Sequence, residues 1–101
     1  MNLGDYKAAI SDLQQYMSLT GENDDLYNTI GIAYLNLKEY NSAIGSITKA
    51  ISINPQNGNY YKNRGYCYLL NGNKTNAKND AVRASNFGIQ LPAELSALIN
   101  D

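Results

Sequence analysis

The chain has 101 residues and a formal net charge of −1, which predicts a single domain with a modest core and no general attraction to nucleic acid or to a membrane surface. It contains no histidine and only one cysteine, Cys67, which excludes an internal disulfide and argues against a catalytic triad, a metal site or a cofactor. No apolar run approaches the roughly 18 residues of a membrane span, and no signal-peptide pattern opens the sequence, so we expect a soluble, cytoplasmic protein.

A first helix is predicted over residues 3–19. Apolar residues recur there at steps of three and four, which places them on one stripe of an amphipathic helix. The stripe consists of Leu3, Tyr6, Ala9, Ile10, Leu13 and Met17. The charged and amide residues fall between these positions, so the other side of the helix faces water.

A second helix is predicted over residues 25–37. Gly21 suits the left-handed backbone that follows a helix end, and Asn23 or Asp24 can cap the helix that comes next. The buried face of this helix is expected to carry Tyr27, Ile30, Gly31 and Tyr34.

The remaining chain predicts further helices over residues 40–53, 59–71, 74–86 and 92–99. Pro55 ends the first of these, because proline disfavours a helical conformation in the residue before it. In the helix over 74–86, the residues expected to point inward are Ala77, Ala81, Val82 and Ala84. Pro92 stands at the start of the last helix, whose Leu95 and Leu98 we expect to cover the apolar edge of the preceding helices.

The chain repeats itself with a period of 34 residues. The shift makes three pairs in the predicted first helices identical, Tyr27 with Tyr61, Gly31 with Gly65 and Tyr34 with Tyr68, and it aligns Ala9, Ala43 and Ala77 in the second helices. A glycine inside a helix costs about 1 kcal/mol relative to alanine. We therefore expect Gly31 and Gly65 to allow two helix backbones to approach closely.

This order of an aromatic residue, an aliphatic residue, Gly and Tyr, then Ala and an apolar residue, then Pro, resembles the tetratricopeptide repeat. The resemblance implies an all-α fold, a right-handed superhelix of antiparallel helix pairs. It implies about two and a half repeats in one domain over residues 1–101: a half repeat with only its second helix at 2–23, full repeats at 24–57 and 58–91, and a capping helix at 92–101.

A binding face is predicted on the first helices of the two full repeats, opposite their core stripe. In proteins similar to this one, stacked first helices line a concave groove that holds an extended or helical peptide. The residues expected there are Asn28, Thr29, Ile32, Asn36, Asn59, Lys62, Asn63, Tyr66 and Leu70. Amide groups suit a peptide main chain, and Ile32 and Tyr66 suit apolar side chains. The plainer interpretation is that this face is only the solvated side of two amphipathic helices.

Charge is distributed unevenly along the sequence. Residues 58–91 hold five basic residues and one acidic residue, a net of +4, whereas residues 1–57 hold three basic and six acidic residues, a net of −3. An acidic peptide partner would therefore favour the third unit. The same asymmetry could drive head-to-tail pairing of two copies.

The half repeat predicts an uncovered helix at the N-terminal end. End units of solenoids usually carry a polar outer face, but Tyr6, Ile10 and Met17 are apolar. We therefore expect either self-association through these residues, giving a homo-oligomer, or a piece cut from a longer repeat array.

The leading hypothesis is a non-enzymatic protein-protein interaction module, and structural self-assembly is the alternative. An enzyme is disfavoured because histidine, a phosphate-binding loop and a clustered nucleophile are absent from the sequence.

Arg64 occupies the register position of Ile30, so its stem is expected to pack while its head reaches water or a carboxylate. Cys67 is expected to be a small core residue.

Overall fold

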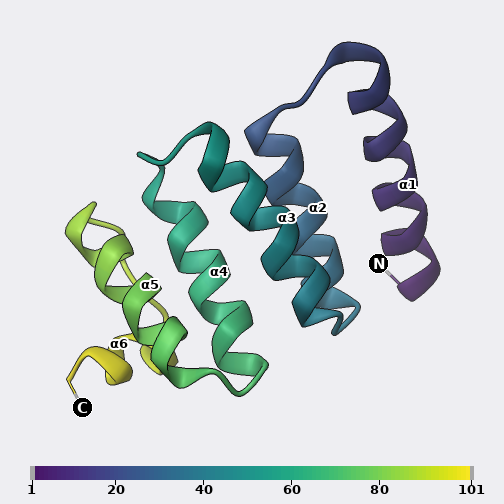
Figure 1. The fold of residues 1–101 in the computed structure, drawn as a ribbon. Coiled ribbons are helices and arrows are strands. Elements are labelled where there is room, and N and C mark those ends of the chain that lie inside the picture. The colour runs from purple at the N-terminus through teal and green to yellow at the C-terminus, as the bar shows by residue number, and fades with distance from the viewer. Residues whose placement is uncertain (1, 101) are drawn as a thin grey trace.

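The structure, a computed structural model, describes residues 2–100 and contains helices joined by turns, with no strand over that range (Figure 1). Its helices are α1 (Leu3–Thr20), α2 (Asp24–Asn36), α3 (Tyr40–Ile53), α4 (Gly58–Leu70), α5 (Lys74–Asn86) and α6 (Ala93–Ile99). The predicted helices are confirmed, with ends that differ by no more than one residue. Among the described residues, no helix is both long and apolar enough to cross a membrane.

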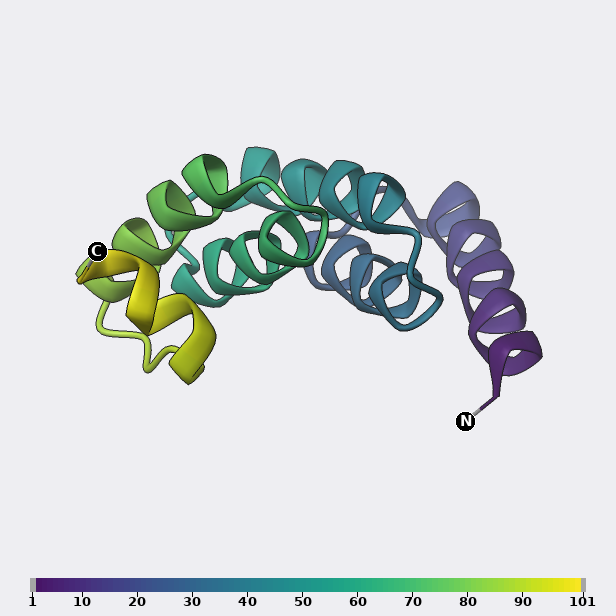
Figure 2. The same ribbon diagram turned by 90° about the horizontal axis from the view of Figure 1, so that it is seen from below.

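The helices stack along a curved array that is 43 × 27 × 18 Å in extent. Each helix packs chiefly on its neighbours in the sequence, and the closest associations are within the pairs α2 with α3 and α4 with α5. Figure 2 shows the array as an arch, with α1, α3 and α5 along its outer side and α2 and α4 along its inner side. We call the inner side of the arch the concave face.

Asparagine residues begin most of the helices. The Asn2 side chain and the Asp5 side chain cap each other's backbone N–H groups at the start of α1. Asn23 Oδ1 accepts from the backbone N–H of Leu26 at 3.1 Å, and Asn73 caps α5 in the same way. Each cap satisfies a donor that the first helical turn leaves unpaired, so the turns between helices fix where each helix starts.

Gly31 of α2 and Gly65 of α4 lie where the paired helices touch. A Cβ atom on Gly31 would lie 2.5 Å from Ile47 Cγ1, and a Cβ atom on Gly65 would lie 3.1 Å from Asp80 Cβ. Both distances are shorter than an ordinary contact between carbon atoms. The expected close approach of α2 to α3 and of α4 to α5 is confirmed.

The core consists of three connected clusters that follow the array. The first joins α1 to α2, the second joins α3 to α2 and α4, and the third joins α5 to α6. Leu95 is fully buried and Leu98 is 9% exposed against Ala77 and Ala81. The expected covering of the last repeat by the C-terminal helix is confirmed, although Pro92 is the cap that precedes α6 and not its first residue.

Two expectations about side-chain burial are wrong. Val82 is 38% exposed, because it lies about 100° around the helix from its buried neighbour Ala81. Ile10 and Met17 are only 6% and 8% exposed, because they pack on α2 beside Ile30. Tyr6 is half-buried in the same cluster, so these residues do not form a bare N-terminal stripe.

The uncovered apolar side chains of α1 lie elsewhere on the helix. Tyr16 is 56% exposed, Leu3 is 61% exposed and Leu19 is 87% exposed. Tyr16 corresponds by the 34-residue shift to Ala50 of α3, which is fully buried in the cluster that joins α3 to α2 and α4. Tyr16 is therefore exposed at a position that neighbouring helices cover in α3.

Candidate functional site

The structure brings α2 and α4 side by side on the concave face. Asn63 of α4 donates a hydrogen bond from Nδ2 to Oδ1 of Asn28 of α2, at 3.1 Å. Both residues belong to the predicted binding face, and both are half-buried. This bond fixes the two parts of that face relative to each other.

The predicted binding face has an exposed apolar part and an exposed polar part. Ile32 is 37% exposed and Leu70 is 43% exposed. The exposed polar residues are Thr29, Asn36 and Asn59, while Lys62 and Tyr66 are half-buried. The concave face thus offers apolar contact and hydrogen-bonding groups from the same two helices.

Two of the exposed polar side chains are oriented by their own helix. Thr29 Oγ1 donates to the carbonyl of Asp25 at 2.9 Å, and Asn36 Nδ2 donates to the carbonyl of Ile32 at 3.0 Å. These bonds use the one donor of Thr29 and one of the two donors of Asn36. Their oxygen atoms remain as acceptors, which suits the N–H groups of a peptide main chain.

Tyr66 differs from the other predicted residues, because it also serves the C-terminal core. It packs against the cluster of Ala77, Ala81, Leu95 and Leu98, into which α6 contributes its two leucines. A substitution of Tyr66 would therefore disturb the seat of α6 as well as the concave face. This makes Tyr66 a poor probe of binding alone.

A buried tyrosine that sequence reasoning missed links the two full units. Tyr60 is 2% exposed, and its hydroxyl donates at 2.8 Å to Oδ2 of Asp24 and also reaches the carboxylate of Asp25. Burial first, and then these two carboxylates, raise the pKa of the Tyr60 hydroxyl. The same hydrogen bond lowers the pKa of Asp24, so the carboxylates at the start of α2 are structural.

Only a weak sequence signal pointed to this link. Tyr60 aligns with Leu26 by the 34-residue shift, so nothing in the first unit corresponds to its hydroxyl. Asp24 and Asp25 are also the ordinary acidic residues of a helix start. The only available signal in the sequence was that Tyr60, which carries a hydroxyl, aligns with the apolar Leu26.

A largely buried ion pair joins α4 to α5. Arg64 Nε donates to Asp80 Oδ2 and Arg64 Nη2 donates to Asp80 Oδ1, both at 2.8 Å. The guanidinium carbon lies 5.8 Å from the ring centroid of Tyr61 and 5.9 Å from that of Tyr68. Hydrogen bonding to Asp80 is the main cause that raises the pKa of Arg64. The expectation that the arginine head reaches a carboxylate is confirmed.

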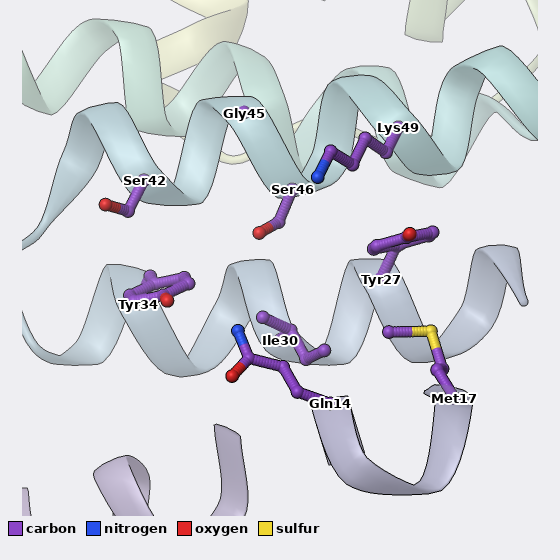
Figure 3. A pocket seen from close by; sticks show the side chains of 9 residues that line it. All are labelled: Gln14, Met17, Tyr27, Ile30, Tyr34, Ser42, Gly45, Ser46 and Lys49. Atoms are coloured by element: carbon purple, nitrogen blue, oxygen red, sulfur yellow. The ribbon is translucent and has the colours of Figure 1, made fainter. Parts of the chain in front are cut away.

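A cavity of about 270 Å³ opens on the outer side, between α1 and α3, with α2 as its floor. Its lining residues are Gln14, Met17, Tyr27, Ile30, Tyr34, Ser42, Gly45, Ser46 and Lys49 (Figure 3). The α2 residues in this lining are the core stripe, and they lie on the opposite side of the helix from Asn28 and Ile32. The cavity and the concave face are therefore separate surfaces.

Comparison with known families identifies the repeat. Two family models match the chain, over residues 24–57 and 47–79, and both describe a tetratricopeptide repeat. The chain belongs to the tetratricopeptide repeat family. The second match begins within α3 and ends within α5, so it supports the repeat without testing the predicted boundary between residues 57 and 58.

Two of the solved structures that share this fold are of a chaperone from Yersinia enterocolitica. The type III secretion chaperone SycD in complex with a peptide of the translocator YopD matches with a TM-score of 0.83, at 16% identity over 96% of this chain and 79% of that chain. A second structure of the translocator chaperone SycD gives a TM-score of 0.79, at 19% identity over 96% and 68%. The search of curated proteins finds no match.

Proposed function

We propose that this tetratricopeptide repeat protein is a non-enzymatic protein-protein interaction module that binds a segment of a partner on its concave face. The proposed module consists of a half repeat at 2–23, full repeats at 24–57 and 58–91, and a capping helix at 92–101. The observation that carries the proposal is the Asn63–Asn28 hydrogen bond, which holds two helices together so that one segment can contact both.

The composition of the concave face supports a peptide as the ligand. Ile32 and Leu70 offer apolar contact, and the amide groups of Asn36 and Asn59 offer hydrogen bonds. Lys62 adds a positive charge beside Asn63, which favours an acidic residue in the bound segment. The peptide-bound SycD chaperone, with the same fold, is a precedent for a protein segment as ligand.

A photo-crosslinking experiment tests this proposal. A photoreactive phenylalanine analogue is placed at Ile32 on the concave face, and a matched one at Ser52, an exposed residue of α3. Each protein is irradiated in a lysate of its source cells. The proposal expects a crosslinked partner from position 32 that is competed by an excess of unmodified chain. Equal yield of the same partner from position 52, or no partner from position 32, would contradict it.

Self-assembly is the second candidate, and the exposed apolar residues of α1 favour it. Leu19 and Tyr16 present more surface to water than buried Ile10 and Met17, which were expected to serve this purpose. The variant Leu19→Gln should therefore lower any oligomer measured by light scattering without lowering stability. An unchanged oligomer in Leu19→Gln and Tyr16→Gln would remove this candidate.

A further inference from the structure

The cavity on the outer side of the arch has a counterpart one repeat later in the chain. The 34-residue shift aligns its residues Tyr27, Ile30, Tyr34, Ser46 and Lys49 with Tyr61, Arg64, Tyr68, Asp80 and Arg83. The tyrosine pair and the basic residue are retained in both places. Among these five pairs, the two that differ in chemistry are Ile30 with Arg64 and Ser46 with Asp80.

In the later repeat, the chain places a carboxylate between two cations. Asp80 accepts both hydrogen bonds from Arg64, and its Oδ1 lies 3.5 Å from Nη1 of Arg83. Arg83 lies over the Tyr61 ring, with its guanidinium carbon 5.9 Å from the ring centroid. The carboxylate of Asp80 is therefore neutralised in place, and its side chain is only 2% exposed.

In the earlier repeat, the cation is retained but the carboxylate is missing. Lys49 Nζ lies 5.5 Å from the ring centroid of Tyr27, as Arg83 lies over Tyr61. Ser46 stands in place of Asp80, and Ile30 in place of Arg64. Within residues 2–100, Lys49 forms no ion pair. The register therefore aligns the cavity residue Ile30 with the arginine that fills the later repeat.

The side chains around this cavity suit a carboxylate on an apolar stem. Figure 3 shows the Lys49 ammonium and the Ser46 hydroxyl on the α3 side of the cavity, above Ile30 and Tyr27 of α2. An ammonium and a hydroxyl are donors for an anion, and the half-buried rings of Tyr27 and Tyr34 offer apolar contact. Glu22, the nearby acidic residue, accepts instead from the Tyr27 hydroxyl at 3.1 Å.

We propose that this cavity binds an acidic side chain of a protein partner. The partner's carboxylate takes the position relative to Lys49 that Asp80 takes relative to Arg83, and its aliphatic stem lies against the half-buried rings of Tyr27 and Tyr34. The cavity of about 270 Å³ has room for an inserted side chain. The proposal concerns the outer side of the arch and does not depend on the concave face.

Amide chemical-shift mapping of the full ¹⁵N-labelled chain tests the proposal. The probes are a blocked Leu-Glu-Leu peptide and its Leu-Gln-Leu counterpart, which has the same shape without the charge. The Glu peptide should shift the amide signals of Gly45, Ser46 and Lys49 and should bind at least about tenfold more tightly than the Gln peptide. Equal affinity for the two peptides would overturn the proposal, as would the absence of shifts at these amides.

Three variants locate the effect. Lys49→Met removes the charge and keeps the stem, and Ser46→Asp supplies the chain's own carboxylate, so both should abolish the preference for Glu over Gln. Lys7→Met on the exposed side of α1 is the matched control and should retain it. Retention of the preference in Ser46→Asp, which keeps Lys49 in place, would overturn the proposal even if Lys49→Met failed to fold. Shifts confined to Asn28 and Asn63 would overturn it while supporting the concave face.

Discussion

Arg64 and Asp80 join α4 to α5 through two parallel hydrogen bonds of 2.8 Å each. Their side chains are 12% and 2% exposed, so the pair is largely removed from water. The preceding repeat has Ile30 and Ser46 at the same register positions. The same register positions therefore hold an ion pair in the repeat over residues 58–91 and line an open cavity in the repeat over residues 24–57.

The variant Asp80→Ala should lower the free energy of unfolding by about 3 kcal/mol, because it leaves the Arg64 guanidinium buried without its partner. Urea unfolding followed by circular dichroism measures this change. The double variant Arg64→Ile with Asp80→Ser, which copies the preceding repeat, should be less destabilised than Asp80→Ala alone. The loss of stability in the double variant should be smaller than the summed losses of the single variants Arg64→Ile and Asp80→Ser. If it equalled that sum, the coupling between the two residues would be absent.

The variant Gly31→Ala should destabilise the protein by about 1–3 kcal/mol, although alanine is the better helix former. Its Cβ would meet Ile47 Cγ1 at 2.5 Å and the backbone carbonyl oxygen of Ala43 at 3.2 Å. Gly45→Ala is the matched control, because no atom lies within 4 Å of a Cβ at that helical position. That variant should gain up to about 1 kcal/mol. The same sign of change in both variants would contradict the close helix approach.

Stability should fall in acid partly through Asp24. The hydrogen bond from Tyr60 lowers the pKa of this carboxyl below its ordinary value of 3.8. A carboxyl whose pKa is lower in the folded state stabilises that state above its unfolded pKa, and the contribution is lost as the pH falls through the folded pKa. The difference in unfolding free energy between wild type and Tyr60→Phe should therefore be present at neutral pH and shrink in strong acid.

Tyr61→Phe is the control for that pH dependence. The Tyr61 hydroxyl donates to the carbonyl of Pro55 at 2.9 Å, an acceptor that does not titrate. The difference in unfolding free energy between wild type and Tyr61→Phe should stay constant between neutral and acid pH in the same urea titrations. If the Tyr60→Phe difference were equally constant, the link between Tyr60 and the acidic start of α2 would contribute nothing.

Cys67 should be inert toward thiol reagents while the protein is folded. The side chain is fully buried, and burial raises the pKa of its thiol to about 11, so the reactive thiolate is scarce at neutral pH. Labelling measured by mass spectrometry should be slow in buffer and accelerate as urea unfolds the chain. Labelling in buffer at the rate of a free thiol would show that α4 opens locally around Cys67 without global unfolding.

Periodicity predicted the helices because the apolar spacing and the turn residues agree along the whole chain. Asn23, Gly31 and Pro55 each have a local physical reason to stand where they do. The family and the all-α fold followed from the same pattern. The register also placed Asn28 and Asn63 on one surface, and their hydrogen bond shows that the two residues do meet.

The side-chain partners could not be predicted, because they depend on the angle between helices. Met17 was expected to be bare, but it packs on α2, and Leu19 is exposed instead. Tyr60 meets Asp24 across 36 residues, a contact for which the repeat pattern has no position. The sequence pattern made no prediction for Asp80, which is buried and accepts hydrogen bonds from Arg64.

Hydrogen exchange of the backbone amides, measured for the chain alone and for the chain with its crosslinked partner segment bound, tests the concave-face proposal most directly. The proposal predicts slowed exchange in α2 and α4, centred on the turns that contain Ile32 and Asn63, with little change in α1. Slowed exchange confined to α1 around Tyr16 and Leu19, with α2 and α4 unaffected, would contradict it.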